Sequence, residues 1–255
     1  MIIILSPSKT LDFETPYKGI AHTQPEFIKE SENLISSLRT YSKAKLAGLM
    51  DISDKLAALN VQRYQDFSTP FTLQNARQAL LAFKGDVYDG IPVETYKKAD
   101  FEFAQAHLRI LSGLYGLLRP LDLIQPYRLE MGIALKNARG KDLYAFWGDR
   151  LTMALNKELN KHDNPVLVNL ASQEYFAAVM PNILKYKIIN VHFKENQKGK
   201  LKVVGLFAKK ARGLMAHYVI SKQLDDCNQL KEFTENGYSF EKSLSGDSDY
   251  IFVRG

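Results

Sequence analysis

The chain has 255 residues, of which 45% are hydrophobic and 24% are charged, and its formal net charge is +6. These values are typical of a globular protein with one large domain or two small ones. One cysteine, Cys227, excludes a disulfide framework and a thiolate metal cluster. The initial apolar run, Met1 to Leu5, is too short for a secretory signal or a membrane span, so we expect a cytoplasmic protein without membrane contact.

The first part of the sequence predicts one strand followed by helices. Ile2 to Leu5 is a short apolar run, as in a fully buried strand. Thr23-Gln-Pro-Glu26 matches a capping box and predicts the start of a helix. Further helical patterns cover residues 43–50, 54–65 and 73–82.

Two aspartates are placed to cap later helices. Asp100 precedes an apolar face that begins at Phe101 and extends to Leu111. Asp142 precedes a wide apolar stripe from Leu143 to Leu159, which predicts one continuous helix. Both stripes are expected to pack in the core.

Strand patterns are concentrated later in the chain. Residues 166–170 form a second buried-type run. Residues 188–193 and 201–207 flank Gln197-Lys-Gly-Lys200, which predicts a hairpin.

The last two strands are expected at residues 238–240 and 250–253, paired with each other. Helical patterns dominate the middle of the chain and strands its ends. The sequence therefore predicts an α/β or α+β fold, with a mixed sheet surrounded by helices. No linker or internal repeat is evident, so a single domain over residues 1–255 is expected.

The segment from Leu108 to Gly132 fits neither a regular core element nor a short polar loop. Glycines and prolines interrupt it every few residues, and Arg109, Arg119 and Arg128 are spaced among leucines. Glycine permits close backbone approach, and arginine suits an anion. Two interpretations stay open: an anion-binding segment, or a tightly packed connector with arginines on its solvent-exposed face.

Three polar segments each follow an expected strand: Ser6-Pro-Ser-Lys-Thr10, Asn169-Leu-Ala-Ser172 and Lys209-Lys-Ala-Arg-Gly213. Ligands in such sheets bind beyond the carboxyl ends of the strands. The segments would converge there if their strands are parallel neighbours. The first segment lacks the spacing of a nucleotide-hydrolysing P-loop.

The third segment places Lys209, Lys210 and Arg212 at the expected start of a helix. A cation costs about 0.3–1 kcal/mol at a helix N-terminus, because that end is partly positive. A bound anion would turn this penalty into a gain, whereas solvent exposure and salt would merely make it tolerable. The surrounding residues 185–223 contain ten Lys/Arg and one acid, which favours either a polyanion-facing surface or a solubility face.

Acid–base and metal sites give weaker signals. Lys84 and Asp86 flank Gly85, either as an acid–base pair or as a surface turn with a local ion pair. The five histidines are scattered without metal-ligand spacing, so no metal site is expected, and no cofactor motif is present.

Several motifs together resemble the peroxide-stress protein YaaA family, in order and over essentially the whole chain. They are Ser6-Pro-Ser-Lys-Thr-Leu11, Phe83-Lys-Gly-Asp-Val-Tyr88, Leu111-Ser-Gly-Leu-Tyr-Gly-Leu-Leu-Arg-Pro-Leu-Asp122, Pro126-Tyr-Arg-Leu-Glu-Met-Gly132, Asn169-Leu-Ala-Ser172 and Lys209-Lys-Ala-Arg-Gly213. The resemblance implies a cytoplasmic bacterial protein that limits oxidative damage during peroxide stress, partly by keeping free intracellular iron low. It also implies an α/β fold with a positively charged cleft, DNA binding, and a helix-hairpin-helix-like element over Leu108 to Leu123. It implies no established catalytic residues.

The first functional hypothesis is a DNA-binding protein with a basic cleft, for duplex or branched DNA with little sequence preference. Tyr115 or Tyr127 would stack on an exposed base. The predicted DNA- or anion-binding residues are Ser6, Ser8, Lys9, Lys84, Arg109, Arg119, Tyr127, Arg128, Ser172, Lys209, Lys210 and Arg212.

The alternative is an enzyme that acts on a nucleotide or a nucleic-acid base, with Asp86 or Glu130 as the proton-transfer group. Arg128 and Glu130 are two residues apart, so in an extended segment both side chains would point to the same face. Glu130 would then orient Arg128, act as the catalytic acid, or form a plain surface ion pair. Iron storage is disfavoured, because the sequence contains no carboxylate–histidine cluster.

Overall fold

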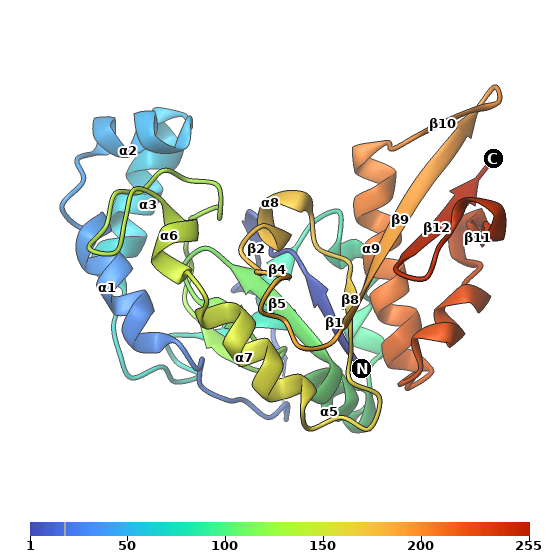
Figure 1. The fold of residues 1–255 in the computed structure, drawn as a ribbon. Coiled ribbons are helices and arrows are strands. Elements are labelled where there is room, and N and C mark those ends of the chain that lie inside the picture. The colour runs from blue at the N-terminus through green and yellow to red at the C-terminus, as the bar shows by residue number, and fades with distance from the viewer. Residues whose placement is uncertain (18) are drawn as a thin grey trace.

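A mixed eight-stranded sheet forms the centre of the molecule in the computed structural model, which describes residues 1–17 and 19–255 (Figure 1). The strand order is β11-β12-β9-β8-β1-β5-β6, and β10 pairs with β9. β6, β10 and β11 are antiparallel to their neighbours, whereas the other strands are parallel. The strands are β1 (Ile2–Leu5), β5 (Leu108–Ser112), β6 (Gly116–Leu118), β8 (Val166–Asn169), β9 (Lys187–Gln197), β10 (Lys200–Lys202), β11 (Ser239–Phe240) and β12 (Asp249–Arg254).

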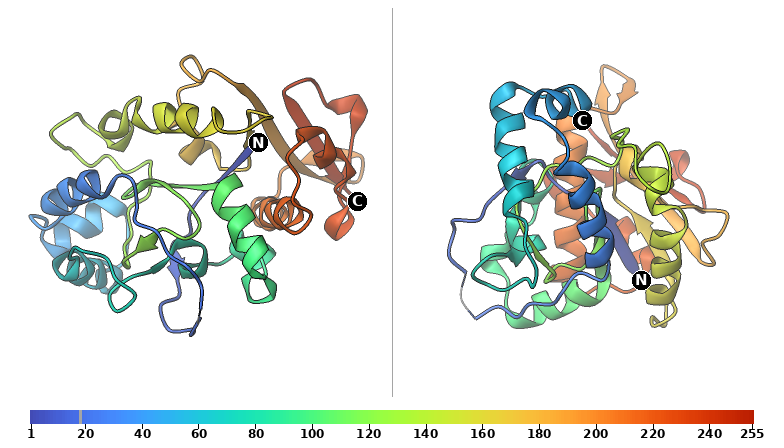
Figure 2. Two further views of the ribbon diagram at one scale, coloured as in Figure 1. Left: turned by 90° about the horizontal axis from the view of Figure 1, so that it is seen from below. Right: turned by 90° about the vertical axis from the view of Figure 1, so that its left-hand side faces the viewer.

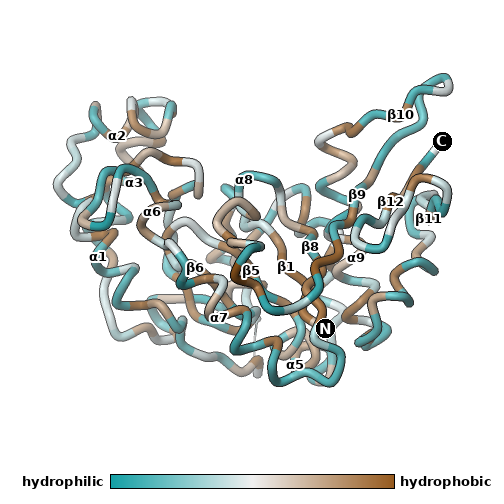
Figure 3. The backbone as a smooth tube through the Cα atoms, in the orientation of Figure 1, coloured by the Kyte–Doolittle hydropathy of each residue, from teal (hydrophilic) through white to brown (hydrophobic). Residues whose placement is uncertain are grey.

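The predicted N-terminal strand lies inside this sheet. β1 pairs with β8 on one side and β5 on the other, so Ile3 faces Val168 and Leu108. All of its side chains are buried, and Figure 3 shows the hydrophobic colour of β1 and β5 at the centre of the fold. A parallel strand covered on both faces carries a continuous apolar run, which explains the run at Ile2–Leu5.

Helices surround the sheet. In the views of Figures 1 and 2, α1–α3 and α6 gather at one end of the molecule, and α9 lies with β9 and β12 at the other. Among the described residues, no helix combines the length and the apolar character that crossing a bilayer requires. The helices are α1 (Ile28–Leu38), α2 (Lys43–Met50), α3 (Asp54–Asp66), α4 (Ala79–Ala82), α5 (Lys98–His107), α6 (Leu143–Trp147), α7 (Arg150–Leu159), α8 (Gln173–Phe176) and α9 (Gly205–Ser221), with short 3₁₀ helices η1 (Tyr88–Gly90), η2 (Val93–Thr95), η3 (Cys227–Glu232), η4 (Glu235–Gly237) and η5 (Lys242–Leu244).

Two small two-stranded sheets pair loop segments outside the main sheet. β2 (Thr10–Leu11), directly after the first polar segment, pairs with β4 (Phe83–Lys84). β3 (Arg77–Gln78) pairs with β7 (Leu123–Ile124). The loop after β1 is therefore held against the loop after β4.

The mixed α/β class is confirmed, as are several local predictions. The helices expected at residues 43–50 and 54–65 are α2 and α3, and each has a serine N-cap. The hairpin joins β9 and β10 through Lys198 and Gly199. β11 and β12 pair antiparallel, as expected for the last two strands.

Four helix predictions are wrong at their ends. Asp100 is not the N-cap of α5, because Lys97 takes that position and Asp100 lies in the first turn. The helix expected over residues 73–82 is reduced to α4, because Arg77 and Gln78 pair with β7. Thr23 does not cap α1: its hydroxyl donates to Asp122 over 2.6 Å, and the helix begins at Ile28. The helix expected from Leu143 to Leu159 is broken at Gly148, whose φ of 51° is left-handed and separates α6 from α7.

The helix-hairpin-helix-like element implied over Leu108 to Leu123 is also wrong. β5, β6 and β7 occupy this range, and it contains no helix. α5 ends at His107 because Leu108 begins to pair with Ile3 of β1. The apolar spacing from Phe101 to Leu111 therefore crosses a helix-to-strand boundary, and pairing with β1 decides the structure of its second half.

Candidate functional site

A pocket of about 410 Å³ lies beyond the carboxyl ends of β1 and β8. The Ser172 amide donates to Ser6 Oγ over 2.8 Å, and the Ser6 hydroxyl donates to Ser172 Oγ over 3.2 Å. The first two polar segments therefore converge as predicted, because β1 and β8 are parallel neighbours.

The third polar segment reaches the pocket by a different route from the one predicted. α9 begins at Gly205, so Lys209, Lys210 and Arg212 lie beyond its first turn rather than at its N-terminus. The strand expected over residues 201–207 is correspondingly short, ending at Lys202. The predicted helix-end penalty does not apply here, because the effect of the dipole is confined to the first turn. Lys209 and Arg212 nevertheless line the pocket, whereas Lys210 is exposed outside its lining.

Close backbone packing sets the position of α9 against the pocket. A Cβ atom placed on Gly213 would lie 1.7 Å from the carbonyl oxygen of Val87, and one on Gly90 would lie 2.6 Å from the amide nitrogen of Leu214. Only glycine permits this approach. The contact brings Arg212 beside the loop of Gly85, Asp86 and Val87, which forms another wall of the pocket.

Arg212 has no counter-charge in the described part of the chain. Its Nε atom is shielded from solvent without a hydrogen-bond partner, and no carboxylate lies within 4.0 Å of the guanidinium. Burial lowers the pKa of Arg212. Arginine nonetheless remains protonated in proteins. The pocket thus has a largely buried cation without a compensating anion.

A buried carboxylate adjoins the same pocket. Glu130 Oε1 lies 3.0 Å from Lys9 Nζ and 2.8 Å from Arg128 Nη2. The carboxylate's other oxygen, Oε2, is shielded and unpartnered within the described residues, as is Arg128 Nε. Arg128 and Glu130 therefore point the same way, as predicted, and Lys9 lines both the pocket and the small hollow around Glu130.

The tyrosines proposed for base stacking are buried. Tyr127 and Tyr115 are 5% and 0% exposed. The Tyr127 hydroxyl lies 2.7 Å from Ser112 Oγ, and burial raises the pKa of Tyr127 well above its ordinary value. A different tyrosine, Tyr175, lines the pocket, and it was not among the predicted site residues.

Lys84 and Asp86 do not form the local pair that was one reading of their spacing. Lys84 Nζ lies 3.8 Å from Asp12 Oδ2, and Asp86 Oδ2 lies 3.3 Å from Lys209 Nζ. Asp86 therefore joins the loop to α9 at the pocket, whereas Lys84 lies outside its lining.

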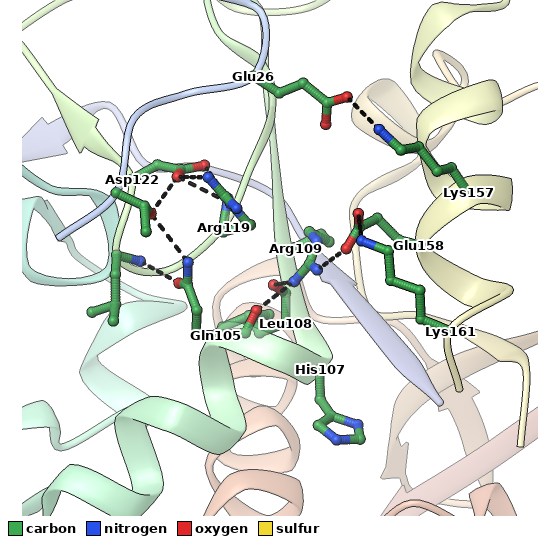
Figure 4. A network of polar contacts seen from close by, with 12 residues as sticks. Glu26, Gln105, His107, Leu108, Arg109, Arg119, Asp122, Lys157, Glu158 and Lys161 are labelled. Atoms are coloured by element: carbon green, nitrogen blue, oxygen red, sulfur yellow. Dashed lines mark hydrogen bonds and ion pairs between the residues drawn. The ribbon is translucent and has the colours of Figure 1, made fainter. Parts of the chain in front are cut away.

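Arg109 and Arg119 are separated from the pocket, in the polar network of Figure 4. The Arg109 guanidinium donates to the carbonyl oxygens of Gln105 and Leu108 over 2.9 and 2.7 Å, and to Glu158 Oε2 over 2.5 Å. Arg119 Nη2 donates to Asp122 Oδ1 over 2.8 Å. Arg119, whose side chain is 37% exposed, matches the connector interpretation. Arg109 does not, because it is buried within the segment instead of lying on a solvent-exposed face, and Arg128 adjoins the pocket.

One possible metal-ligand group is present that the sequence spacing did not indicate. Candidate ligand atoms of His107, His162 and Asp225 lie within 4.8 Å of one another. Burial lowers the pKa of both histidines, to about 4 for His162. Asp225 also pairs with the Met1 ammonium, so an incoming cation would compete with that ion pair. The three residues come from distant parts of the chain, which is why no motif marks them.

Comparison with known proteins identifies relatives over the full chain. A family model described as peroxide stress protein YaaA matches residues 1–244. A UPF0246 protein of Ralstonia nicotianae is 54% identical over 254 residues, covering 100% of this chain and 99% of the relative. A UPF0246 protein of Paraburkholderia xenovorans is 53% identical over 256 residues, covering 100% and 98%. These matches confirm the resemblance drawn from the motifs.

Proposed function

The chain belongs to the peroxide stress protein YaaA family, and from this premise we propose that it is a DNA-binding protein of the hydrogen-peroxide response. The observation that carries the proposal is the uncompensated Arg212 in a pocket edged by two exposed lysines. The Lys9 and Lys209 side chains are 63% and 55% exposed. Lysine, arginine and hydroxyl groups are the usual partners of backbone phosphates.

The proposed binding is directed at the DNA backbone. Lys209 and Lys210 extend from the exposed side of α9, and the Ser8 and Ser172 hydroxyls lie at the pocket. Lys209 and Lys210 are point charges on exposed side chains, which suit phosphates rather than base edges. Duplex or branched DNA would therefore bind with little sequence preference, and the affinity would depend on salt.

The direct test is a titration of labelled duplex and branched DNA at increasing salt. Each neutralised phosphate contributes a slope of about −0.9 to log K against log salt. Lys209→Met/Lys210→Met should reduce both the affinity and this slope, whereas Lys43→Met/Lys55→Met removes the same charge from α2 and α3 and should change little. Salt-independent binding, or no binding at low salt, contradicts the proposal.

In the cell, the proposed role is protection from peroxide damage that depends on free iron. Loss of the gene should increase sensitivity to hydrogen peroxide and raise free intracellular iron, and the wild-type gene should restore both. Unchanged growth together with unchanged free iron in the deletion strain counts against this role.

A second candidate function, favoured by the buried Glu130, is an enzyme acting on a nucleotide or a nucleic-acid base. An unpartnered carboxylate oxygen beside an anion pocket is suited to proton transfer. If Glu130 only orients Arg128, Glu130→Gln should weaken DNA binding modestly and Arg128→Ala should weaken it more. If Glu130 is catalytic, Glu130→Gln should leave binding intact and abolish peroxide protection. We expect the result for an orienting Glu130. If Glu130→Gln and Arg128→Ala both bind DNA and protect from peroxide like the wild type, both roles are excluded.

A further inference from the structure

We propose that the pocket binds a single phosphate monoester the size of a nucleoside monophosphate, with its phosphate on Arg212. This inference rests on the second candidate function, because it names the substrate class for that site. It differs from backbone binding by DNA, since the ligand enters the pocket instead of lying across its edge.

The charge balance of the pocket favours an anion at Arg212. Each neighbouring cation has a carboxylate within 4.0 Å: Lys9 and Arg128 share Glu130, and Lys209 has Asp86. In the described part of the chain, Arg212 alone among these four cations has none. A buried charge without a partner is unfavourable. A bound anion would supply the missing partner.

The hydroxyl groups at the pocket have hydrogens left to donate. Ser6 Oγ accepts from the Ser172 amide and donates to Ser172 Oγ, so the Ser172 hydroxyl hydrogen must point elsewhere. Ser8 Oγ accepts from the Thr10 amide and likewise keeps its hydrogen. These donors and the Arg212 guanidinium suit the three terminal oxygens of a phosphate monoester.

The remaining lining indicates an organic group beside the phosphate. Pro7, Leu170 and Tyr175 give the pocket apolar walls, and about 410 Å³ is far more space than a phosphate ion fills. Pockets of roughly 300–1,000 Å³ with a few polar groups commonly hold small organic ligands. Asp86 and Glu174 would accept hydrogen bonds from ligand hydroxyl or amino groups.

The test is isothermal titration calorimetry of the full chain at fixed ionic strength, with the four ribonucleoside and four deoxyribonucleoside 5′-monophosphates. At least one should bind at least about tenfold more tightly than its unphosphorylated nucleoside or inorganic phosphate. Arg212→Met should weaken that binding at least tenfold, and Lys55→Met should not. The inference is overturned if none of the eight binds, if the nucleoside or phosphate binds equally well, or if Arg212→Met has no effect.

A stability measurement distinguishes a ligand-binding arginine from a structural one. Because Arg212 is uncompensated, the melting temperature of the ligand-free Arg212→Met variant should equal or exceed that of the wild type. A lower melting temperature would show that Arg212 supports the fold, and would overturn the assignment. Nucleotide binding without turnover would contradict the enzyme function but would still support this inference. DNA binding is tested independently by the salt titration.

Discussion

Arg109 is buried and Arg212 is half-buried, and the two arginines also differ in what surrounds the guanidinium. Arg109 contacts two backbone carbonyls and Glu158 (Figure 4). Arg212 has a shielded Nε atom and no carboxylate partner within the described chain. The informative quantity is the number of hydrogen-bonding groups left without a partner.

The difference arises from the elements that face each side chain. Arg109 lies on β5 opposite α7, which supplies Glu158. Arg212 lies on α9, where Gly213 packs directly against the backbone at Val87. The carboxylate of this loop, Asp86, pairs with Lys209 instead of Arg212, so Arg212 is left available to a ligand.

The largest expected effect is the loss of Arg109. Arg109→Met removes one partner of a buried ion pair and leaves Glu158 with an incompletely compensated charge. Breaking such a pair costs about 3–5 kcal/mol. Urea denaturation should show a fall in the free energy of unfolding near this range, in contrast to the unchanged or increased stability expected for Arg212→Met.

The double substitution Arg109→Met/Glu158→Leu provides the control. Removing both charges eliminates the uncompensated carboxylate, so much of the lost stability should return. A double variant as unstable as the single one would show that packing of the Arg109 side chain, and not its charge, holds α7 to β5.

A smaller loss is expected from Gly213→Ala. The added Cβ would lie 1.7 Å from the Val87 carbonyl oxygen, so α9 or the loop must move. Overpacking of this kind typically costs about 1–3 kcal/mol. Gly48→Ala on α2 is the matched control, because its Cβ would meet no atom within 4 Å and should stabilise the helix slightly. Equal unfolding free energies for Gly213→Ala and wild type would contradict the close packing.

The contrast also shows where the sequence predicts the fold. Short-range signals were sufficient for β1, α2 and the β9–β10 hairpin, because apolar runs, serine caps and turn residues act within a few positions. They failed at Leu108–Leu111, where an apolar spacing compatible with a helix becomes a strand. Pairing with β1, more than a hundred residues earlier, decides that structure.

The site was predictable to the extent that it follows from topology. Ser6 and Ser172 meet because their strands are parallel neighbours, which the apolar runs indicated. The sequence pointed to Arg212 because a helix N-terminus was expected at that segment, but α9 begins earlier, at Gly205. The sequence could not separate Arg212 from Arg109, because the partner that satisfies Arg109 is a glutamate on a distant helix.

Acid should weaken the Arg109 region through protonation of Glu158. Burial alone would raise the pKa of Glu158, but hydrogen bonds from Lys161 and Arg109 outweigh it and lower the pKa to about 2. The folded-state pKa is below the ordinary value, so this stabilisation is full above about pH 4.5 and is lost as the pH falls toward 2. In urea denaturation at a series of pH values, Glu158→Gln should flatten this part of the profile. A profile identical to wild type would remove Glu158 as a source of acid sensitivity.

The smallest effect is expected at Arg119, which is intermediate between the two regions. Its side chain is 37% exposed and pairs with the buried Asp122. Asp122 also accepts hydrogen bonds from the Arg119 amide, over 2.8 Å, and from the Thr23 hydroxyl, over 2.6 Å. These bonds remain in Arg119→Ala, and water can reach the vacated position. The loss in unfolding free energy should therefore be about 1 kcal/mol or less, as for exposed ion pairs. A loss as large as that of Arg109→Met would show that exposure and surviving partners do not decide what an arginine contributes here.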